Sequence, residues 1–135
     1  MKILLTGAKG FIGRNFLRQY SDTYDFECVD IAEDIRNTKF DPSIDAVVHL
    51  GAFAGVRRSH DIPEEFWEMN VIGTQQIFDQ YMGRPIVWAS SSSIYEWWLS
   101  PYATTKKVCE QIAPGYTLGL RFHTVYGADS RPDRS

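Results

Sequence analysis

Short apolar runs alternate with amphipathic segments along this chain of 135 residues. Several of the apolar runs end in glycine or in hydroxyl side chains, which is typical of buried parallel strands. Because parallel strands must be joined by crossover segments, usually helices, the alternation predicts βαβ units in an α/β fold with a doubly wound parallel sheet. We expect strands at residues 2–8, 25–31, 45–53, 85–93 and 116–127, and helices at residues 11–20, 63–82 and 102–113.

Residues 32–44 are polar and contain Pro42, which predicts a loop, with a turn of helix or an edge strand as alternatives. The sequence has no internal repeat, low-complexity tract or linker. We therefore expect a single minimal domain over residues 1–135.

The composition argues against several classes of partner. The formal net charge is -3, and the basic residues are scattered, so we expect no nucleic-acid partner. The opening "MKILLTGAKG" is too short for the apolar core of a signal peptide, and no later run is long enough to span a bilayer. These features predict no membrane partner and a cytoplasmic location.

The cysteines and histidines do not form a metal-binding pattern. Cys28 and Cys109 are far apart, and we expect two buried thiols in a reducing compartment. His49, His60 and His123 show no metal-ligand spacing with one another or with a cysteine, so no metal site is expected.

Three glycines are spaced three residues apart between the first strand and the first helix, in "TGAKGFIG": Gly7, Gly10 and Gly13. Glycine allows a tight turn and lets backbone N–H groups approach a pyrophosphate at a helix N-terminus. On their own, these glycines would fit a simple helix-starting turn equally well. Asp30, at the end of the second strand, strengthens the case for a Rossmann-like dinucleotide site, because its carboxylate can accept hydrogen bonds from the adenosine ribose.

The same aspartate indicates which dinucleotide binds. A carboxylate at Asp30 would repel a 2′-phosphate, so NAD is favoured and NADP is less expected. Arg14 and Arg36 remain alternative partners for such a phosphate.

A tyrosine and a lysine four residues apart follow a run of serines. Tyr102 and Lys106 would share one helix face, and a lysine ammonium favours the phenolate form of a nearby tyrosine. Serine can hydrogen-bond the same substrate oxygen. Such pairs are also common on ordinary helices, and it is their order after a dinucleotide loop that favours proton transfer.

The motifs together resemble the extended short-chain dehydrogenase/reductase family, the NAD-dependent epimerases and dehydratases of nucleotide sugars. The resemblance covers residues 2–127 and rests on "TGAKGFIG", "VVHLGAF", "NVIGT", "SSSSIYE", "PYATTK" and "LRFHTVYG" in the family's order.

The resemblance implies roles for individual residues. It implies an acid/base at Tyr102, a lysine at Lys106 that binds the nicotinamide ribose, and a catalytic serine at Ser91, with Ser92 a close alternative. The implied cofactor-binding residues are Gly7, Gly10, Phe11, Ile12, Gly13, Asp30, Asp34, Ile35, Gly51, Ala52, Phe53, Asn70, Tyr102 and Lys106. The segment "AGVRRSHDIPEEF" resembles the branch acting on UDP-glucuronate or UDP-N-acetylhexosamines, and the implied substrate-binding residues are Arg57, Ser92 and Thr124.

The chain departs from the family pattern in two places. Only six residues, 96–101, separate Tyr95 from Tyr102, with Glu96 where glycine is usual. The sequence also stops soon after "VYGADSRPDRS", where the family's substrate domain begins, so we expect a minimal or truncated form.

These departures leave three functions open. They are nucleotide-sugar epimerisation or dehydration, a non-catalytic NAD-binding or interaction module, and reduction of a small carbonyl. The resemblance further implies a homodimer through helices 63–82 and 102–113, to which Trp97 and Trp98 could add a contact.

Overall fold

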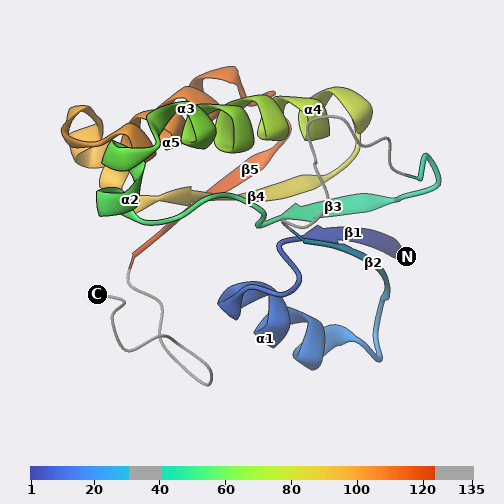
Figure 1. The fold of residues 1–135 in the computed structure, drawn as a ribbon. Helices are drawn as coiled ribbons and strands as arrows, with labels where there is room; N and C mark the ends of the chain where they lie inside the picture. Colours follow the sequence, from blue (N-terminus) through green and yellow to red (C-terminus); the bar gives the residue numbers. More distant parts are fainter. Residues whose placement is uncertain (31–40, 124–135) are drawn as a thin grey trace.

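The computed structural model describes residues 1–30 and 41–123, and its centre is a sheet of five parallel strands (Figure 1). The strand order is β2-β1-β3-β4-β5, and each neighbouring pair is parallel. The strands are β1 (Lys2–Thr6), β2 (Asp25–Val29), β3 (Ala46–His49), β4 (Ile86–Ser91) and β5 (Leu118–Phe122). The predicted α/β fold with a Rossmann-like parallel sheet is confirmed.

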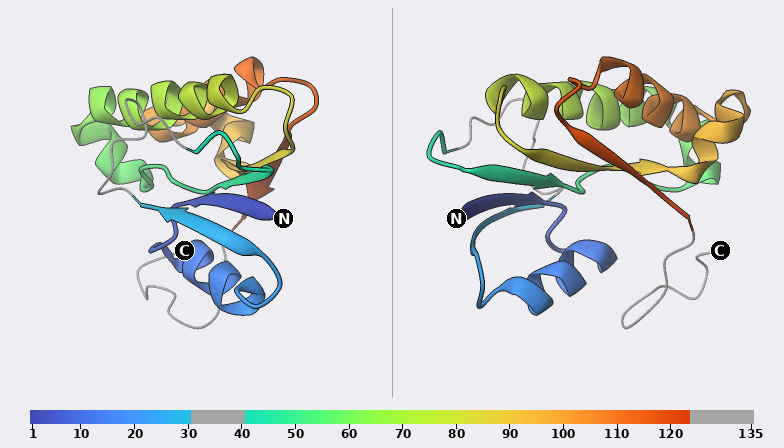
Figure 2. Two further views of the ribbon diagram at one scale, coloured as in Figure 1. Left: turned by 90° about the vertical axis from the view of Figure 1, so that its right-hand side faces the viewer. Right: turned by 180° about the vertical axis from the view of Figure 1, so that it is seen from behind.

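Helices lie on both faces of the sheet, as Figures 1 and 2 show. One face carries α1 (Phe11–Tyr20). The opposite face carries α2 (Val56–Asp61), α3 (Pro63–Phe66), the π-helix η1 (Trp67–Ile72), α4 (Gly73–Gln80) and α5 (Pro101–Ile112). The chain moves from β1 outward to β2 and then returns to the other side of β1 with β3. This change of direction creates the switch point where ligands of such sheets bind.

The core lies between the sheet and the layer of α4 and α5. Leu4, Val47 and Trp88 project from three neighbouring strands into one buried cluster with Phe78 of α4 and Cys109 of α5. The Phe78 and Trp88 rings meet edge to face with centroids 5.9 Å apart, a geometry that aromatic pairs favour. This packing fixes the position of α5 relative to β4.

The expected helix over residues 63–82 is divided into α3, η1 and α4, and it follows a short α2 that the sequence did not predict. Residues 92–99 were also not predicted to be helical, and they form the 3₁₀ helix η2 (Ser92–Leu99). Residues 32–40 of the expected loop lie outside the described ranges, and residues 41–45 belong to no helix or strand.

The cysteine prediction is half wrong. Cys109 is buried, but Cys28 is exposed on β2, a strand at the edge of the described sheet. Across residues 1–30 and 41–123, no helix is long and apolar enough to cross a membrane, and no group of three or more potential metal ligands is found.

Candidate functional site

The glycine loop joins β1 to α1 in a backbone path that larger residues could not follow. Gly7 has a φ of +73°, and a Cβ there would lie 2.8 Å from Gly51 N. A Cβ on Gly13 would lie 2.1 Å from Gly7 O, so α1 packs directly on the turn. Ala8 N–H donates to Val29 O at 3.2 Å, which brings the loop beside the end of β2.

This loop fits the diphosphate of a dinucleotide. The ten-residue helix α1 starts at Phe11, has no acidic residue in its first turn, and has no side chain capping its N-terminus. The N–H groups of that turn carry the positive end of the helix dipole, which favours an anion. Asp30 follows β2 directly, so the structure brings the predicted ribose acceptor next to the predicted phosphate loop.

The end of β3 is held to β1 and α4 through a buried histidine. Thr6 Oγ1 lies 2.6 Å from His49 Nδ1 and accepts a hydrogen bond from Gly51 N–H at 2.9 Å. His49 Nε2 lies 2.9 Å from Thr74 Oγ1. Burial, assisted by the charge of Lys106, lowers the pKa of His49 to about 3, so the ring is neutral. The histidines of the sequence were compared only with metal-ligand spacing, which gives no sign of a buried histidine that joins two elements by hydrogen bonds.

Asn70 ties the loop after β3 to the helix that carries the tyrosine. Its side chain accepts from Phe53 N–H at 2.7 Å and donates to Phe53 O at 3.0 Å and to Thr105 Oγ1 at 3.2 Å. Thr105 in turn donates to Tyr102 O at 2.7 Å. Asn70 is fully buried within η1, and its side-chain amide bonds to the backbone of Phe53 and to the hydroxyl of Thr105.

The serine, tyrosine and lysine come from helix α5 and from the end of β4. Ser91 is its last residue, and its Oγ accepts from Ser93 N–H at 3.1 Å and lies 2.8 Å from Ser93 Oγ, which caps η2. Ser100 caps α5 by accepting from Ala103 N–H at 3.0 Å, which places Tyr102 in the first turn of that helix.

Lys106 is buried, and its ammonium donates to Ala89 O on β4 at 2.9 Å. An ammonium has three N–H donors, and in the described part of the chain this is the hydrogen bond recorded for it. Ribose hydroxyls could accept from the other two donors. We call this edge of the sheet, where β1, β3 and β4 end, the carboxyl edge.

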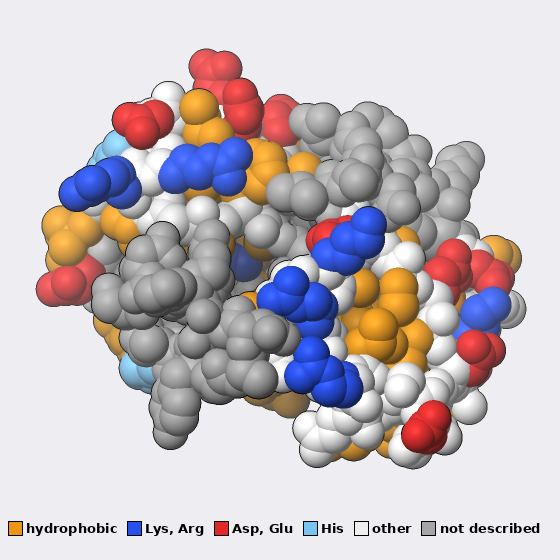
Figure 3. Space-filling view, turned by 60° about the horizontal axis from the view of Figure 1, so that its bottom comes forward, with side chains coloured by type: hydrophobic (Ala, Val, Ile, Leu, Met, Phe, Trp, Pro, Cys, Tyr) orange, Lys and Arg blue, Asp and Glu red, His pale blue; other side chains and the backbone are white. Residues whose placement is uncertain are grey.

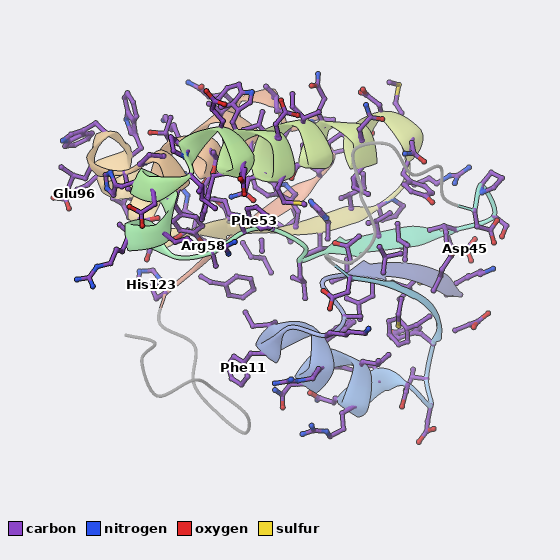
Figure 4. The ribbon with its side chains drawn as sticks, viewed as in Figure 1. Phe11, Asp45, Phe53, Arg58, Glu96 and His123 are labelled. Carbon is purple, nitrogen blue, oxygen red and sulfur yellow. The ribbon has the colours of Figure 1, made fainter. Side chains whose placement is uncertain are left out.

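The carboxyl edge also carries an aromatic cluster with an arginine that the sequence did not single out. The rings of Phe53, Phe66 and Tyr102 meet edge to face, with centroids 5.5 Å and 6.3 Å apart. The Arg58 guanidinium lies 4.8 Å from the centre of the Phe53 ring (Figure 4). In Figure 3 several Lys and Arg side chains lie near the middle of the face and others near its left and right sides, and most Asp and Glu side chains lie near its outline.

Glu110 holds the far side of α5 to the sheet. It accepts from Ser90 Oγ at 2.6 Å and from two nitrogens of Arg121 on β5. Although partial burial acts in the other direction, the hydrogen bonds from Arg121 and Ser90 hold the pKa of Glu110 below its usual range. These hydrogen bonds fix the position of α5 relative to β4.

Several predicted residues lie outside these contacts. Arg57 is exposed on α2, and Ser92 is half-buried at the start of η2. Asp34, Ile35 and Thr124 lie outside the described residues.

Residues 3–135 match the NAD dependent epimerase/dehydratase family. The chain belongs to this family. The resemblance inferred from the motifs is therefore confirmed, and NAD as the cofactor is confirmed at the level of the family.

This chain spans between 36% and 57% of the length of the relatives described next. Protein CapI of Staphylococcus aureus is 30% identical over 98% of this chain and 57% of its own length. A UDP-glucuronate 4-epimerase of Thermodesulfobacterium geofontis is 38% identical over 69% of this chain and 36% of its own length. The structure of MoeE5 in complex with UDP-glucose and NAD superimposes with a TM-score of 0.83, at 29% identity, over 98% of this chain and 57% of MoeE5.

Proposed function

We propose that this chain binds NAD along the carboxyl edge and oxidises a nucleotide sugar, as an epimerase or dehydratase, through Ser91, Tyr102 and Lys106. One observation carries the proposal: the glycine loop, the loop held by Asn70 and the tyrosine–lysine pair all meet at the carboxyl edge. Because the chain spans about half of its relatives, the activity of the whole protein is part of the proposal.

The cofactor would lie across three strand ends. The loop from Gly7 to Gly13 would hold the diphosphate, and Asp30 would accept from the adenosine ribose, which favours NAD over NADP. Phe53 would border the nicotinamide end, where Lys106 would donate to the ribose hydroxyls. Bound NAD supplies the hydride acceptor of the reaction.

The protein side chains would move the proton. Tyr102 would accept the proton of a sugar hydroxyl as a hydride leaves the carbon that carries this hydroxyl. The buried ammonium of Lys106 would stabilise the phenolate form of Tyr102. Ser91 would hydrogen-bond the reacting oxygen after exchanging its bond to Ser93. The resulting ketone would be reduced from its other face, giving an epimer, or would undergo elimination.

The substrate is proposed from the relatives. A similar protein is named UDP-glucuronate 4-epimerase, and MoeE5 was solved with UDP-glucose and with UDP-glucuronic acid. A UDP-hexose or its uronate is therefore the first candidate, with Arg57, Ser92 and Thr124 as the substrate contacts that the motifs predict.

A homodimer through the outer helices is also proposed. The helices η1, α4 and α5 form the outer layer on their side of the sheet (Figure 2), and Trp67 and Ile112 on this layer are exposed. Apolar side chains of this size on neighbouring helices favour association with a second copy.

A non-catalytic NAD-binding module is the second candidate. It is favoured by the bonds of Ser91 to Ser93, which occupy the serine that catalysis would require.

Thermal unfolding with NAD, NADP, UDP-glucose and UDP-glucuronate, followed by NADH absorbance, tests both candidates. A ligand at one hundred times its dissociation constant should stabilise the fold by about 2.7 kcal/mol. We expect NAD to stabilise more than NADP, and Tyr102→Phe to keep NAD binding but lose NADH formation. No stabilisation by either dinucleotide would refute the cofactor assignment, and NAD binding without any sugar turnover would favour the second candidate.

A further inference from the structure

We propose that Arg58 binds an oxyanion of the substrate, either the diphosphate or a sugar carboxylate, beside Tyr102. This inference rests on the proposed function and adds to it a residue that the sequence motifs did not indicate. The motifs pointed to the neighbouring residue Arg57.

The position of Arg58 follows from the loop after β3. That loop passes Phe53, whose backbone Asn70 holds on both sides, and reaches α2 through Gly55 with a φ of +110°. One turn of helix then brings the Arg58 side chain back over the Phe53 ring. The backbone of this arginine is therefore anchored, although its side chain is at the surface.

The guanidinium is oriented by aromatic rings. Its Cζ lies 4.8 Å from the centre of the Phe53 ring and 6.0 Å from that of Phe66, and Phe66 meets Tyr102 edge to face. Stacking occupies the flat face of a guanidinium and leaves its N–H edge available for hydrogen bonds. The Phe66 ring therefore lies between the Arg58 guanidinium and Tyr102, the proposed acid/base.

No protein carboxylate neutralises this cation in residues 1–30 and 41–123. The nearby helices carry Asp61, Glu64 and Glu65, yet no ion pair or hydrogen bond is recorded between them and Arg58. Its planar fork matches the two oxygens of a carboxylate or a phosphate. The diphosphate of NAD has its own site at the glycine loop, at the start of α1, so the substrate is the better source of an anion here.

The test measures dissociation constants by calorimetry on the NAD-bound protein, with UDP, UDP-glucose and UDP-glucuronate as ligands. We expect Arg58→Gln to weaken binding by roughly tenfold or more, and Arg58→Lys to weaken it less because the charge remains. Arg18→Gln, an exposed arginine at the end of α1, serves as the control and should change affinity by less than about twofold. Unfolding of each variant without ligand checks that the fold is kept.

The pattern across ligands identifies the anion. An equal loss for all three ligands assigns Arg58 to the diphosphate, whereas a loss confined to UDP-glucuronate assigns it to the carboxylate. In either case the affinity of Arg58→Gln should depend less on salt than that of the wild type, because one exposed charge pair is gone.

Three outcomes would overturn the proposal. Unchanged affinity in Arg58→Gln would remove Arg58 from substrate binding and leave the proposed function standing. If a separate titration with NAD shows weaker binding in Arg58→Gln while the affinities for the UDP ligands are unchanged, the arginine belongs to the cofactor site. If the wild type binds NAD but none of the three UDP ligands, both the sugar substrate and the role of Arg58 are wrong.

Discussion

Asn70 makes three hydrogen bonds that join two parts of the carboxyl edge, so its removal should be costly for a single residue. Asn70→Ala leaves Phe53 N–H and C=O without their partner in a region of low solvent access. We expect the free energy of unfolding to fall by about 2 kcal/mol, measured by urea denaturation. The matched control is Gln75→Ala on the exposed side of α4, which should change stability by less than about 0.5 kcal/mol. Equal losses in the two variants would contradict the bridging role.

His49 should make the stability of the fold depend on pH. Its pKa is about 3 in the folded protein, against 6.5 for an ordinary histidine, so the unfolded chain binds more protons between these limits. The stabilisation is complete above pH 6.5 and is lost as the pH falls. From pH 7 to pH 5 the histidine should lower the free energy of unfolding by about 2 kcal/mol.

The measurement is urea unfolding at pH 7 and pH 5 for the wild type and His49→Asn. The difference between the two proteins isolates His49, because every other titratable group is common to both. His60→Asn, on the exposed surface of α2, should retain the decline of the wild type. A His49→Asn protein that declines as steeply as the wild type would rule out the neutral buried ring.

Among the secondary-structure elements, the pairing of β4 with β5 depends on the absence of a side chain at Gly119. A Cβ at Gly119 would lie 2.7 Å and 2.8 Å from two carbons of the Trp88 ring, which is rigid and buried in the core. Gly119→Ala should therefore lower the free energy of unfolding by about 1–3 kcal/mol. Gly115→Ala, in the loop before β5, has nothing within 4 Å of its added Cβ and serves as the control in the same thermal melts. A Gly119→Ala protein as stable as the control would show that β5 shifts freely.

The sequence predicted elements whose pattern is local. The run "KILLT" and the glycines behind it predicted β1 and the turn into α1, and the apolar spacing around Tyr102 and Lys106 predicted α5. The π-helix η1 has no such local pattern, and the partners of its Asn70 lie in another loop and in α5. Arg58 was missed for the same reason: its partner Phe53 comes from the loop before it, and stacking leaves no motif in the sequence.

Among the described residues, two of the exposed apolar surfaces could meet a second copy. One is the outer helix layer with Trp67, and the other is the outer strand β5 with Leu118 and Leu120, which are 56% and 39% exposed. If the proposed dimer forms through the helices, Trp67→Glu should lower the dimer fraction in sedimentation velocity, whereas Leu120→Lys should not. Loss of the dimer in Leu120→Lys alone would assign association to the strand edge, as unpaired edges favour.

The two ends of the sheet differ in what they can tolerate. The glycine loop, Phe53 and Ser91 lie where β1, β3 and β4 end. The turn at Gly83 and the loop through Gly115 lie at the opposite ends of the strands, with nothing near either Cβ position. Doubling the length of a surface loop costs only about 0.6 kcal/mol. A peptide tag, a fluorescent domain or a new pair of termini could therefore enter at Gly115 without changing NAD affinity. One end of the sheet therefore carries the proposed site, and the opposite end can accept an added peptide or domain.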